Sequence, residues 1–191
     1  DTATIHVMSF DQVNLALHKS VTASGYENDG MKPEKVVDGD LNSRWSSRHQ
    51  DNEWIVVDIG DCYQLTTVKL YWEAAYATDF DVEVSEDGEQ YTIAKSITGA
   101  EGGVQTIDIR KGGEAVEAQF VRIYCKKRNT GYGSSLWELE IYGEALCDKE
   151  ETAIEWTDGH KDGSNYKFIR DGQLFIRLTD GTIYNAFGTL Q

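Results

Sequence analysis

The sequence predicts an all-β protein built from short antiparallel strands. Apolar and polar residues alternate with a period of two along many short segments, and these segments are rich in β-branched and aromatic residues. Gly, Asn and Asp interrupt the segments as turns between strands do. No segment of useful length shows the apolar spacing of an amphipathic helix. A sandwich or barrel of strands is therefore expected.

The predicted strands follow one another through the middle of the chain. Asp87-Gly88 between two of them is a strong hairpin signal. The single proline, Pro33, lies in a predicted short helix or turn at 32–37. Alternation also predicts that Trp45, Trp54 and Trp72 belong to the core. The strands are expected at 54–59, 65–72, 80–85, 91–96, 104–109, 118–124 and 136–142.

The chain divides into four predicted regions. The linker is rich in Asp, Glu, Lys and Gly, and the last region holds two Asp-Gly turns that predict a three-stranded β-meander. A meander this small is marginal alone and should dock on something. The predicted regions are an N-terminal extension or end of an upstream module at 1–13, the main domain at 14–143, the linker at 144–164 and a small C-terminal β tail at 165–191.

The charge balance excludes some classes of partner. Acidic residues number 33 against 18 basic ones, which gives a formal net charge of −15. Nucleic acids and anionic membranes attract clustered Lys and Arg, so neither is an expected partner. Neutral sugars, cationic sugars and calcium are compatible with this charge, although solubility alone is an alternative explanation for the acidic excess.

Cysteine use and the chain ends say little about the compartment. Cys62, Cys125 and Cys147 form no Cys-x-x-Cys pair, so neither zinc binding nor dithiol chemistry is indicated. Free thiols are expected, and one disulfide stays open as an alternative. No apolar run reaches membrane-spanning length, and no signal peptide opens the sequence. Because Asp1 already lies in a strand-like stretch, we expect a mature protein or a piece of a longer one.

One turn has the composition of a site for a hard cation. Asp38, Asp40 and Ser43 surround the tight turn at Gly39, and calcium prefers such oxygen ligands. Glu138 supplies another carboxylate on the closing predicted strand. If the fold brings the two segments together, one calcium ion would join the two ends of the domain. The alternative is a plain solvated turn.

Residues 14–143 carry a series of motifs that are weak singly and specific in their order. The motifs are Asn14-Leu15-Ala16, Val37-Asp38-Gly39-Asp40, Ser43-Arg44-Trp45, WIVVDIG at 54–60, YWEAAYA at 71–77, VSEDG at 84–88, FVRIY at 120–124 and YGSSLWELEIYG at 132–143. With them the chain resembles the discoidin-like, coagulation-factor type C superfamily, and within it the bacterial family 32 carbohydrate-binding modules. Residues 167–176 loosely resemble a C-terminal tail of secreted glycan-degrading proteins from gut bacteria.

The resemblance implies an antiparallel jelly-roll sandwich whose loops form a shallow sugar site at one end. It implies a non-catalytic module for oligo- or polysaccharides, with an upstream catalytic domain in the same polypeptide. A glycoside hydrolase of the chitobiase or β-hexosaminidase type is the expected parent, in a secreted, periplasmic or cell-surface protein. The resemblance also implies structural calcium, held by side chains of Asp38, Asp40, Ser43 and Glu138 and by backbone carbonyls of Lys35, Ser43 and Trp137.

The resemblance also assigns the sugar-binding residues. One subgroup binds ends of β-linked, gluco-configured chains, such as chitosan, chitin oligosaccharides, β-glucan and mannan. In that subgroup the positions that match Glu27, Arg44, His49, Glu73 and Tyr132 face the ligand, and the loops of this chain add Tyr76 and Arg128 as candidates. Tyr76 stands where galactose-binding relatives carry Arg, so galactose is not the expected ligand. The expected carbohydrate-binding set is Glu27, Arg44, His49, Glu73, Tyr76, Arg128 and Tyr132.

Structural roles remain as alternatives for several of these residues. Arg44 beside Trp45 is also explained as an ion-pair partner, and Glu73 as a neighbour of the core residue Trp72. His49 and Arg128 fit either role. Glu27 and Tyr132 lie in Gly- and Asn-rich loops and are expected to be functional.

Two other classes of function are weighed against binding. A glycosidase needs two carboxyl groups facing each other across a cleft, and Glu27 and Glu73 would serve only in a deep, water-excluding pocket. Short loops on a sandwich are not expected to build one. A protein or membrane adhesion domain would need apolar spikes and basic loops, which this sequence does not show. We therefore expect a binding module rather than an enzyme.

Overall fold

The computed structural model describes residues 13–145, 166–170, 173–177 and 182–185. Strands dominate these residues, which confirms the all-β prediction, and the predicted turn at 32–37 contains a short 3₁₀ helix, η1. The elements are β1 (Ser20–Ala23), η1 (Pro33–Val36), β2 (Trp45–Ser46), β3 (Glu53–Trp72), β4 (Ala77–Ser85), β5 (Thr92–Ile97), β6 (Val104–Asp108), β7 (Val116–Arg128), β8 (Ser135–Ala145), β9 (Tyr166–Arg170), β10 (Gln173–Arg177) and β11 (Ile183–Asn185).

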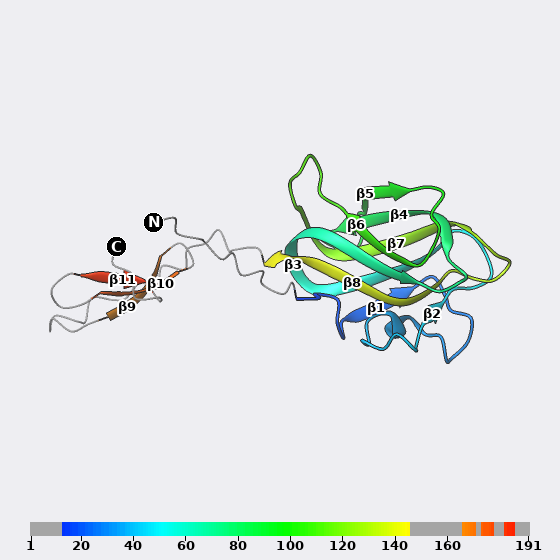
Figure 1. Cartoon of the computed structure of the whole chain (residues 1–191), viewed down its shortest axis with the longest axis horizontal. Coiled ribbons are helices and arrows are strands. Elements are labelled where there is room, and N and C mark those ends of the chain that lie inside the picture. The colour runs from blue at the N-terminus through cyan, green and yellow to red at the C-terminus, as the bar shows by residue number, and fades with distance from the viewer. Residues whose placement is uncertain (1–12, 146–165, 171–172, 178–181, 186–191) are drawn as a thin grey trace, which may run out of the picture. The chain divides into compact units, whose positions relative to one another are not determined.

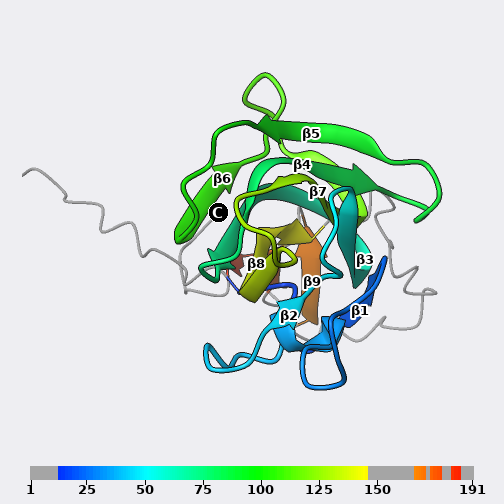
Figure 2. The ribbon, with the colours of Figure 1, turned by 90° about the vertical axis from the view of Figure 1, so that its right-hand side faces the viewer.

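The long strand β3 belongs to both layers of an antiparallel sandwich (Figure 1). Its first half pairs with β1 and β7, and its second half pairs with β6 and β8. β4 and β5 continue the first layer beyond β7, while β2 continues the second layer beyond β8. Figure 2 shows β4, β5 and β7 on one side of the sandwich and β2 and β8 on the other. The fold thus brings the start and the end of this domain together at β2 and β8.

Two predicted strands, 54–59 and 65–72, are one strand with a break in its pairing. The register of β3 with β7 shifts between Asp58 and Tyr63. Gly60 lies inside this irregularity with φ of +89°, a conformation that side chains other than hydrogen disfavour. A bulge of this kind bends a strand and increases its twist, which lets β3 pass from one layer to the other.

The core lies between the two layers and follows the predicted alternation. Ile55 and Val57 of β3 are fully buried, as is Trp45, and Trp72 is nearly so. Trp72 also meets Phe80 edge to face, with ring centroids 5.3 Å apart. The prediction was wrong for Trp54, which is only half-buried. Glu53 and Ile55, the residues on either side of Trp54, are buried, so the Trp54 indole lies on the opposite face of β3.

The C-terminal meander is a separate three-stranded sheet. Its strands pair antiparallel in the order β11-β10-β9, as the Asp-Gly turns predicted. The pattern of contacts divides the chain into two compact units, Asp1–Leu146 and Cys147–Gln191. Residues 144 and 145 of the predicted linker belong to β8, and the rest of the linker, like residues 1–12 of the predicted N-terminal extension, lies outside the described residues. No helix within the described ranges is long and apolar enough to cross a membrane.

Candidate functional site

Four segments meet at one end of the sandwich, and we call them the rim: residues 25–29, 46–52, 73–76 and 128–135. Backbone hydrogen bonds tie them together. Glu27 N–H donates to the carbonyl of Ser46 at 2.8 Å, Glu73 N–H donates to that of Ser135 at 3.0 Å, and Ser47 N–H donates to that of Ser134 at 2.9 Å. The rim is therefore a set of loops braced against β2 and β8.

The structure brings three of the predicted sugar-binding residues together. Ser46 Oγ donates to Glu27 Oε2 at 2.9 Å, and Nε2 of His49 lies 3.6 Å from Glu27 Oε1. His49 in turn meets the ring of Tyr132 edge to face, with centroids 5.6 Å apart. Tyr132 is 65% exposed, although aromatic rings are usually covered, so its face is open to a ligand. A carboxylate, an imidazole and a flat apolar surface thus stand side by side.

Arg44 lies directly before β2. Trp45 pairs with Leu136 and Ser46 with Ser135, which places Arg44 opposite Trp137. The Arg44 guanidinium stacks on the Trp137 ring, with 5.2 Å from Cζ to the ring centroid. Within the described part of the chain Arg44 forms no ion pair, and its buried Nε has no hydrogen-bond partner. The structural ion pair considered for Arg44 is therefore not formed.

Glu73 lies directly after β3. Its backbone contacts Ser135 on the side of β8 that faces away from β2. Its Oε2 accepts a hydrogen bond from Ala75 N–H at 2.8 Å, and the residue is half-buried. Ser135 Oγ donates to Ser46 Oγ at 2.9 Å, and Ser46 donates to Glu27. The two serine hydroxyls thus lead to the Glu27 carboxylate, whereas Glu73 meets Ser135 only through its backbone N–H.

Tyr76 and Arg128 are placed differently from the other candidates. Tyr76 packs against the core and against Gly102. Arg128 donates from Nε to Asp51 Oδ1 at 2.9 Å and from Nη1 to the carbonyls of Gly131 and Tyr132, both at 3.1 Å. These hydrogen bonds direct its guanidinium toward the protein, and the bond from Arg128 lowers the pKa of Asp51 below its ordinary value.

A buried carboxylate that the sequence analysis missed supports the His49 loop. Glu53 is 1% exposed and accepts hydrogen bonds from Arg48 Nε at 3.1 Å and from Ser24 Oγ at 2.6 Å, with Gln50 Nε2 as a further partner. A signal was available, because Glu53 precedes the core residue Ile55 by two in the alternation. A buried charge needs such partners, so this group fixes the loop on either side of His49.

The predicted calcium turn lies beside β8. Ser43 Oγ donates to Asp38 Oδ2 at 2.6 Å, and Nζ of Lys35 is 3.5 Å from the same oxygen. Asp40 Oδ1 accepts from Asn42 N–H at 2.9 Å, which lowers the pKa of Asp40. The turn is thus rich in oxygen atoms, and part of their bonding capacity is used within the turn itself.

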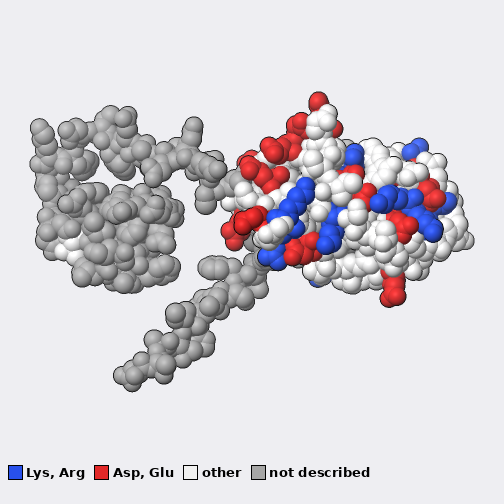
Figure 3. Space-filling model, turned by 90° about the horizontal axis from the view of Figure 1, so that it is seen from above, with Lys and Arg blue, Asp and Glu red and all other residues white. Residues whose placement is uncertain are grey.

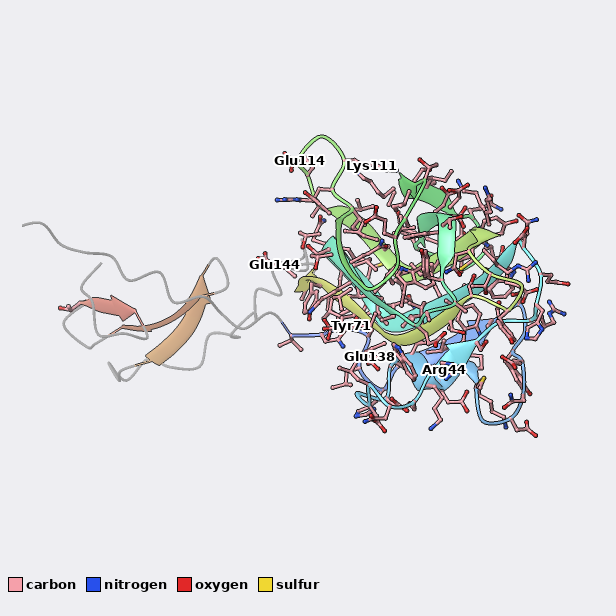
Figure 4. The ribbon with its side chains drawn as sticks, turned by 45° about the vertical axis from the view of Figure 1, so that its right-hand side comes forward. Arg44, Tyr71, Lys111, Glu114, Glu138 and Glu144 are labelled. Carbon is pink, nitrogen blue, oxygen red and sulfur yellow. The ribbon has the colours of Figure 1, made fainter. Side chains whose placement is uncertain are left out.

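Glu138 approaches this turn from β8, as the sequence predicted. Gly39 N–H donates to Glu138 Oε1 at 3.3 Å, while the buried Oε2 has no hydrogen-bond partner. Burial, and to a smaller extent the charge of Asp38, raises the pKa of Glu138 to about 7. Figure 4 shows Glu138 near Arg44, with Tyr71, its register partner on β3, beside it. Over the described ranges no three His, Cys, Asp or Glu side chains gather closely enough to hold a metal by themselves.

Other features of the surface lie away from these residues. A groove of about 340 Å³ runs between the β4–β5 hairpin and the loop that carries Lys111 and Glu114 (Figure 4). Neither Glu27 nor Glu73 lines it.

On the face seen in Figure 3, basic and acidic side chains interleave over the described residues. Cys62 and Cys125 are free thiols, and Cys147 lies outside the described residues.

Comparison with known proteins gives three informative similarities. The model of the F5/8 type C domain matches residues 20–139. Chitosan-binding module 2 of a chitosanase/glucanase from Paenibacillus sp. IK-5, solved in complex with chitotriose, is 38% identical with a TM-score of 0.65, and the match covers 68% of this chain and 100% of that module. The family 32 module of Clostridium perfringens NanJ, in complex with galactose, is 16% identical with a TM-score of 0.57 over 65% of this chain and 93% of that one, so it supports the fold alone.

A curated relative of this chain is a much longer protein. It is the polysaccharide lyase 8 family protein HylA of Enterococcus faecalis, which is 32% identical over 143 residues. The match covers 68% of this chain and 10% of that protein. This chain thus spans about a tenth of its length, so the activity of the longer protein does not transfer by similarity.

Proposed function

The chain belongs to the F5/8 type C domain family, and we propose that residues 14–143 are a non-catalytic carbohydrate-binding module for the ends of β-linked, gluco-configured or amino-sugar chains. The observation that carries the proposal is the exposed group of Glu27, His49 and Tyr132 on a braced rim. The Paenibacillus modules of 38% identity are named for chitosan binding, and their whole length is matched.

The chemistry of the rim suits an amino sugar. The face of Tyr132 would stack on the apolar C–H surface of a sugar ring. Glu27 and Glu73 supply two carboxylates to the rim, and a carboxylate forms its strongest hydrogen bonds with a charged donor such as the ammonium group of glucosamine. Arg44, whose guanidinium stacks on Trp137, would donate to ring hydroxyl groups.

We further propose that the module serves an attached catalytic domain of an exported glycoside hydrolase, for which a chitobiase or β-hexosaminidase is the candidate architecture. A single sugar site of this size binds weakly. Tethering converts that weak contact into a high local concentration of the catalytic domain on its glycan. A secreted, periplasmic or cell-surface location follows from the proposal, because insoluble glycans lie outside the cytoplasm.

We also propose that one calcium ion occupies the space between the Asp38 turn and Glu138. The buried, unpartnered Oε2 of Glu138 supports this, since an uncompensated carboxylate oxygen in the interior is costly and a divalent cation would satisfy it. The candidate ligands are Asp38, Asp40 and Ser43, the carbonyls of Lys35 and Trp137, and Glu138. The ion would balance the negative charge of these carboxylates, and its ligands would hold the turn against β8.

The proposal is tested by isothermal titration calorimetry of the full chain. The titrants are oligomers of glucosamine, N-acetylglucosamine, cellobiose-type glucose, mannose and galactose, and anionic vesicles serve as a control for the adhesion alternative. Saturable heat with a glucosamine or gluco-configured oligomer, and none with vesicles, is expected. Binding to vesicles alone would overturn the proposal, and so would release of product from a chromogenic N-acetylglucosaminide.

A further inference from the structure

Two consecutive residues at the end of β7 hold the other rim segments in place. Arg128 and Asn129 both stand in the segment 128–135, which carries Tyr132. Resting on the proposed sugar-binding function, we infer that Arg128 and Asn129 are positioning residues, which set the geometry of the site without contacting the sugar. This reassigns Arg128, which the sequence alone placed among the ligand contacts.

Arg128 joins the loop of Tyr132 to the loop of His49. Its Nη1 donates to two consecutive carbonyls, those of Gly131 and Tyr132, and its Nε donates to Asp51. The backbone N–H of Arg128 also donates to Asp51 Oδ1 at 3.2 Å. Its side chain is 20% exposed, so the guanidinium is largely covered by the groups it binds. The fork geometry of arginine is what allows one side chain to hold two loops.

Asn129 joins the same segment to the loop that carries Glu73. Its Oδ1 accepts from Tyr76 N–H at 2.9 Å, and its Nδ2 donates to the carbonyl of Ala74 at 2.9 Å. Its own N–H donates to the carbonyl of Tyr76 at 3.0 Å. The side-chain amide of Asn129 therefore pairs with both an N–H group and a carbonyl of the backbone after Glu73, as a neighbouring β-strand would.

These contacts fix the site before a ligand arrives. Tyr132 itself is exposed, and its N–H is bonded only locally, to Thr130 Oγ1 at 3.1 Å. Without the contacts from Arg128 its loop would have to become ordered on binding, at the expense of affinity. A positioning role therefore predicts weaker binding with little change in the fold, and a more mobile Tyr132 in the free protein.

The test compares single and double variants of the full chain in titrations with the glucosamine trimer. Asp51→Ala should weaken binding about tenfold, the effect of losing one charged hydrogen bond, and Arg128→Ala at least as much, because it also removes the contacts with the carbonyls of Gly131 and Tyr132. Arg128→Ala/Asp51→Ala should weaken binding by less than the sum of the two single effects, because both changes remove the contact between Arg128 Nε and Asp51. Asn129→Ala should also weaken binding, because it removes both the acceptor for Tyr76 N–H and the donor to the Ala74 carbonyl. Arg110→Ala removes an exposed ion pair with Asp108 outside the rim and should bind as wild type.

A second measurement separates this inference from the proposed function. Backbone ¹⁵N relaxation of the free proteins should show lower order parameters at Gly131 and Tyr132 in Arg128→Ala, with circular dichroism and melting temperature unchanged. Unchanged order parameters would overturn the inference even if sugar binds. A direct role of Arg128 in contacting sugar would instead appear as a large loss in Arg128→Ala, a negligible loss in Asp51→Ala and additive effects in the double variant. If wild type binds no glycan, the proposed function fails, and the relaxation data still decide the positioning role.

Discussion

Gly39 donates its backbone N–H to Oε1 of Glu138 at 3.3 Å, across a separation of 99 residues. The contact joins the turn after η1 to the closing strand β8, so both ends of the domain meet beneath the rim. It leaves Oε2 of Glu138 buried without a hydrogen-bond partner. The stability of this end of the sandwich therefore depends on which group balances the charge of the Glu138 carboxylate.

Calcium should stabilise the protein through Glu138. A ligand that binds only the folded state at 100 times its dissociation constant adds about 2.7 kcal/mol, which corresponds to a rise in Tm of several degrees. Thermal melts in calcium and in EDTA should differ by that amount for wild type and should coincide for Glu138→Gln. Glu144→Gln, an exposed position on the same strand, is the matched control and should behave as wild type. A wild-type melt that EDTA leaves unchanged would remove the calcium site.

The metal-free protein should lose stability as the pH rises toward neutrality. Burial raises the pKa of Glu138 from 4.5 to about 7. Between these values the folded state holds a proton that the unfolded state has released, so the free energy of unfolding falls as pH rises from about 4.5 to about 7. The total fall is at most about 3 to 4 kcal/mol, for a rise of about 2.5 pKa units at 1.36 kcal/mol each. Urea unfolding in EDTA should show this slope for wild type and a flatter one for Glu138→Gln. Parallel slopes would contradict the argument.

Removing the ring of Tyr132 should abolish sugar binding and leave the fold intact. Its ring is 65% exposed and contacts His49 by its edge, so the core does not depend on it. Loss of a central aromatic anchor costs 2 kcal/mol or more, about thirtyfold or greater in affinity. Tyr132→Phe keeps the stacking face and should bind nearly as wild type. Tyr26→Ala, at another exposed tyrosine of the rim region, tests whether any surface aromatic has this effect. Equal affinity of wild type and Tyr132→Ala on a glycan array would remove this site assignment.

The close approach of two rim loops should make Gly133 intolerant of any side chain. A Cβ at Gly133 would lie 2.1 Å from the carbonyl oxygen of Ser47, which is backbone and cannot swing away. Gly133→Ala should therefore separate the loops and destabilise the protein by about 1–3 kcal/mol, as overpacking does. Gly131→Ala meets nothing within 4 Å and is the matched control in the same loop. Chemical denaturation would measure both, and equal midpoints would show that the loops do not need this contact.

Much of the fold could be predicted from alternation and turn composition. The strands of the sandwich and the C-terminal meander are present, and the Asp87-Gly88 hairpin joins β4 to β5. β1 and β2 were missed because a strand of four or two residues is too short to show a period. The merging of two predicted strands into β3 depends on the bulge at Gly60, which a sequence pattern reads as a turn.

The candidate site could be predicted less completely. The approach of Gly39 to Glu138 and of Glu27 to His49 agrees with the motifs. The contacts of Arg128 could not be derived from residue type, because an arginine in a loop suits a ligand and a backbone carbonyl equally well. Only the positions of Gly131 and Tyr132 in space distinguish these roles.

The central claim is that the rim binds the sugar, and an NMR titration tests it most directly. Backbone amide shifts would be followed while the glucosamine trimer is added to the full chain. We expect the largest changes to cluster at Glu27, His49, Glu73 and Tyr132. Shifts confined to the groove between residues 84–92 and 111–117, or no shifts with any of the oligosaccharides above, would contradict it.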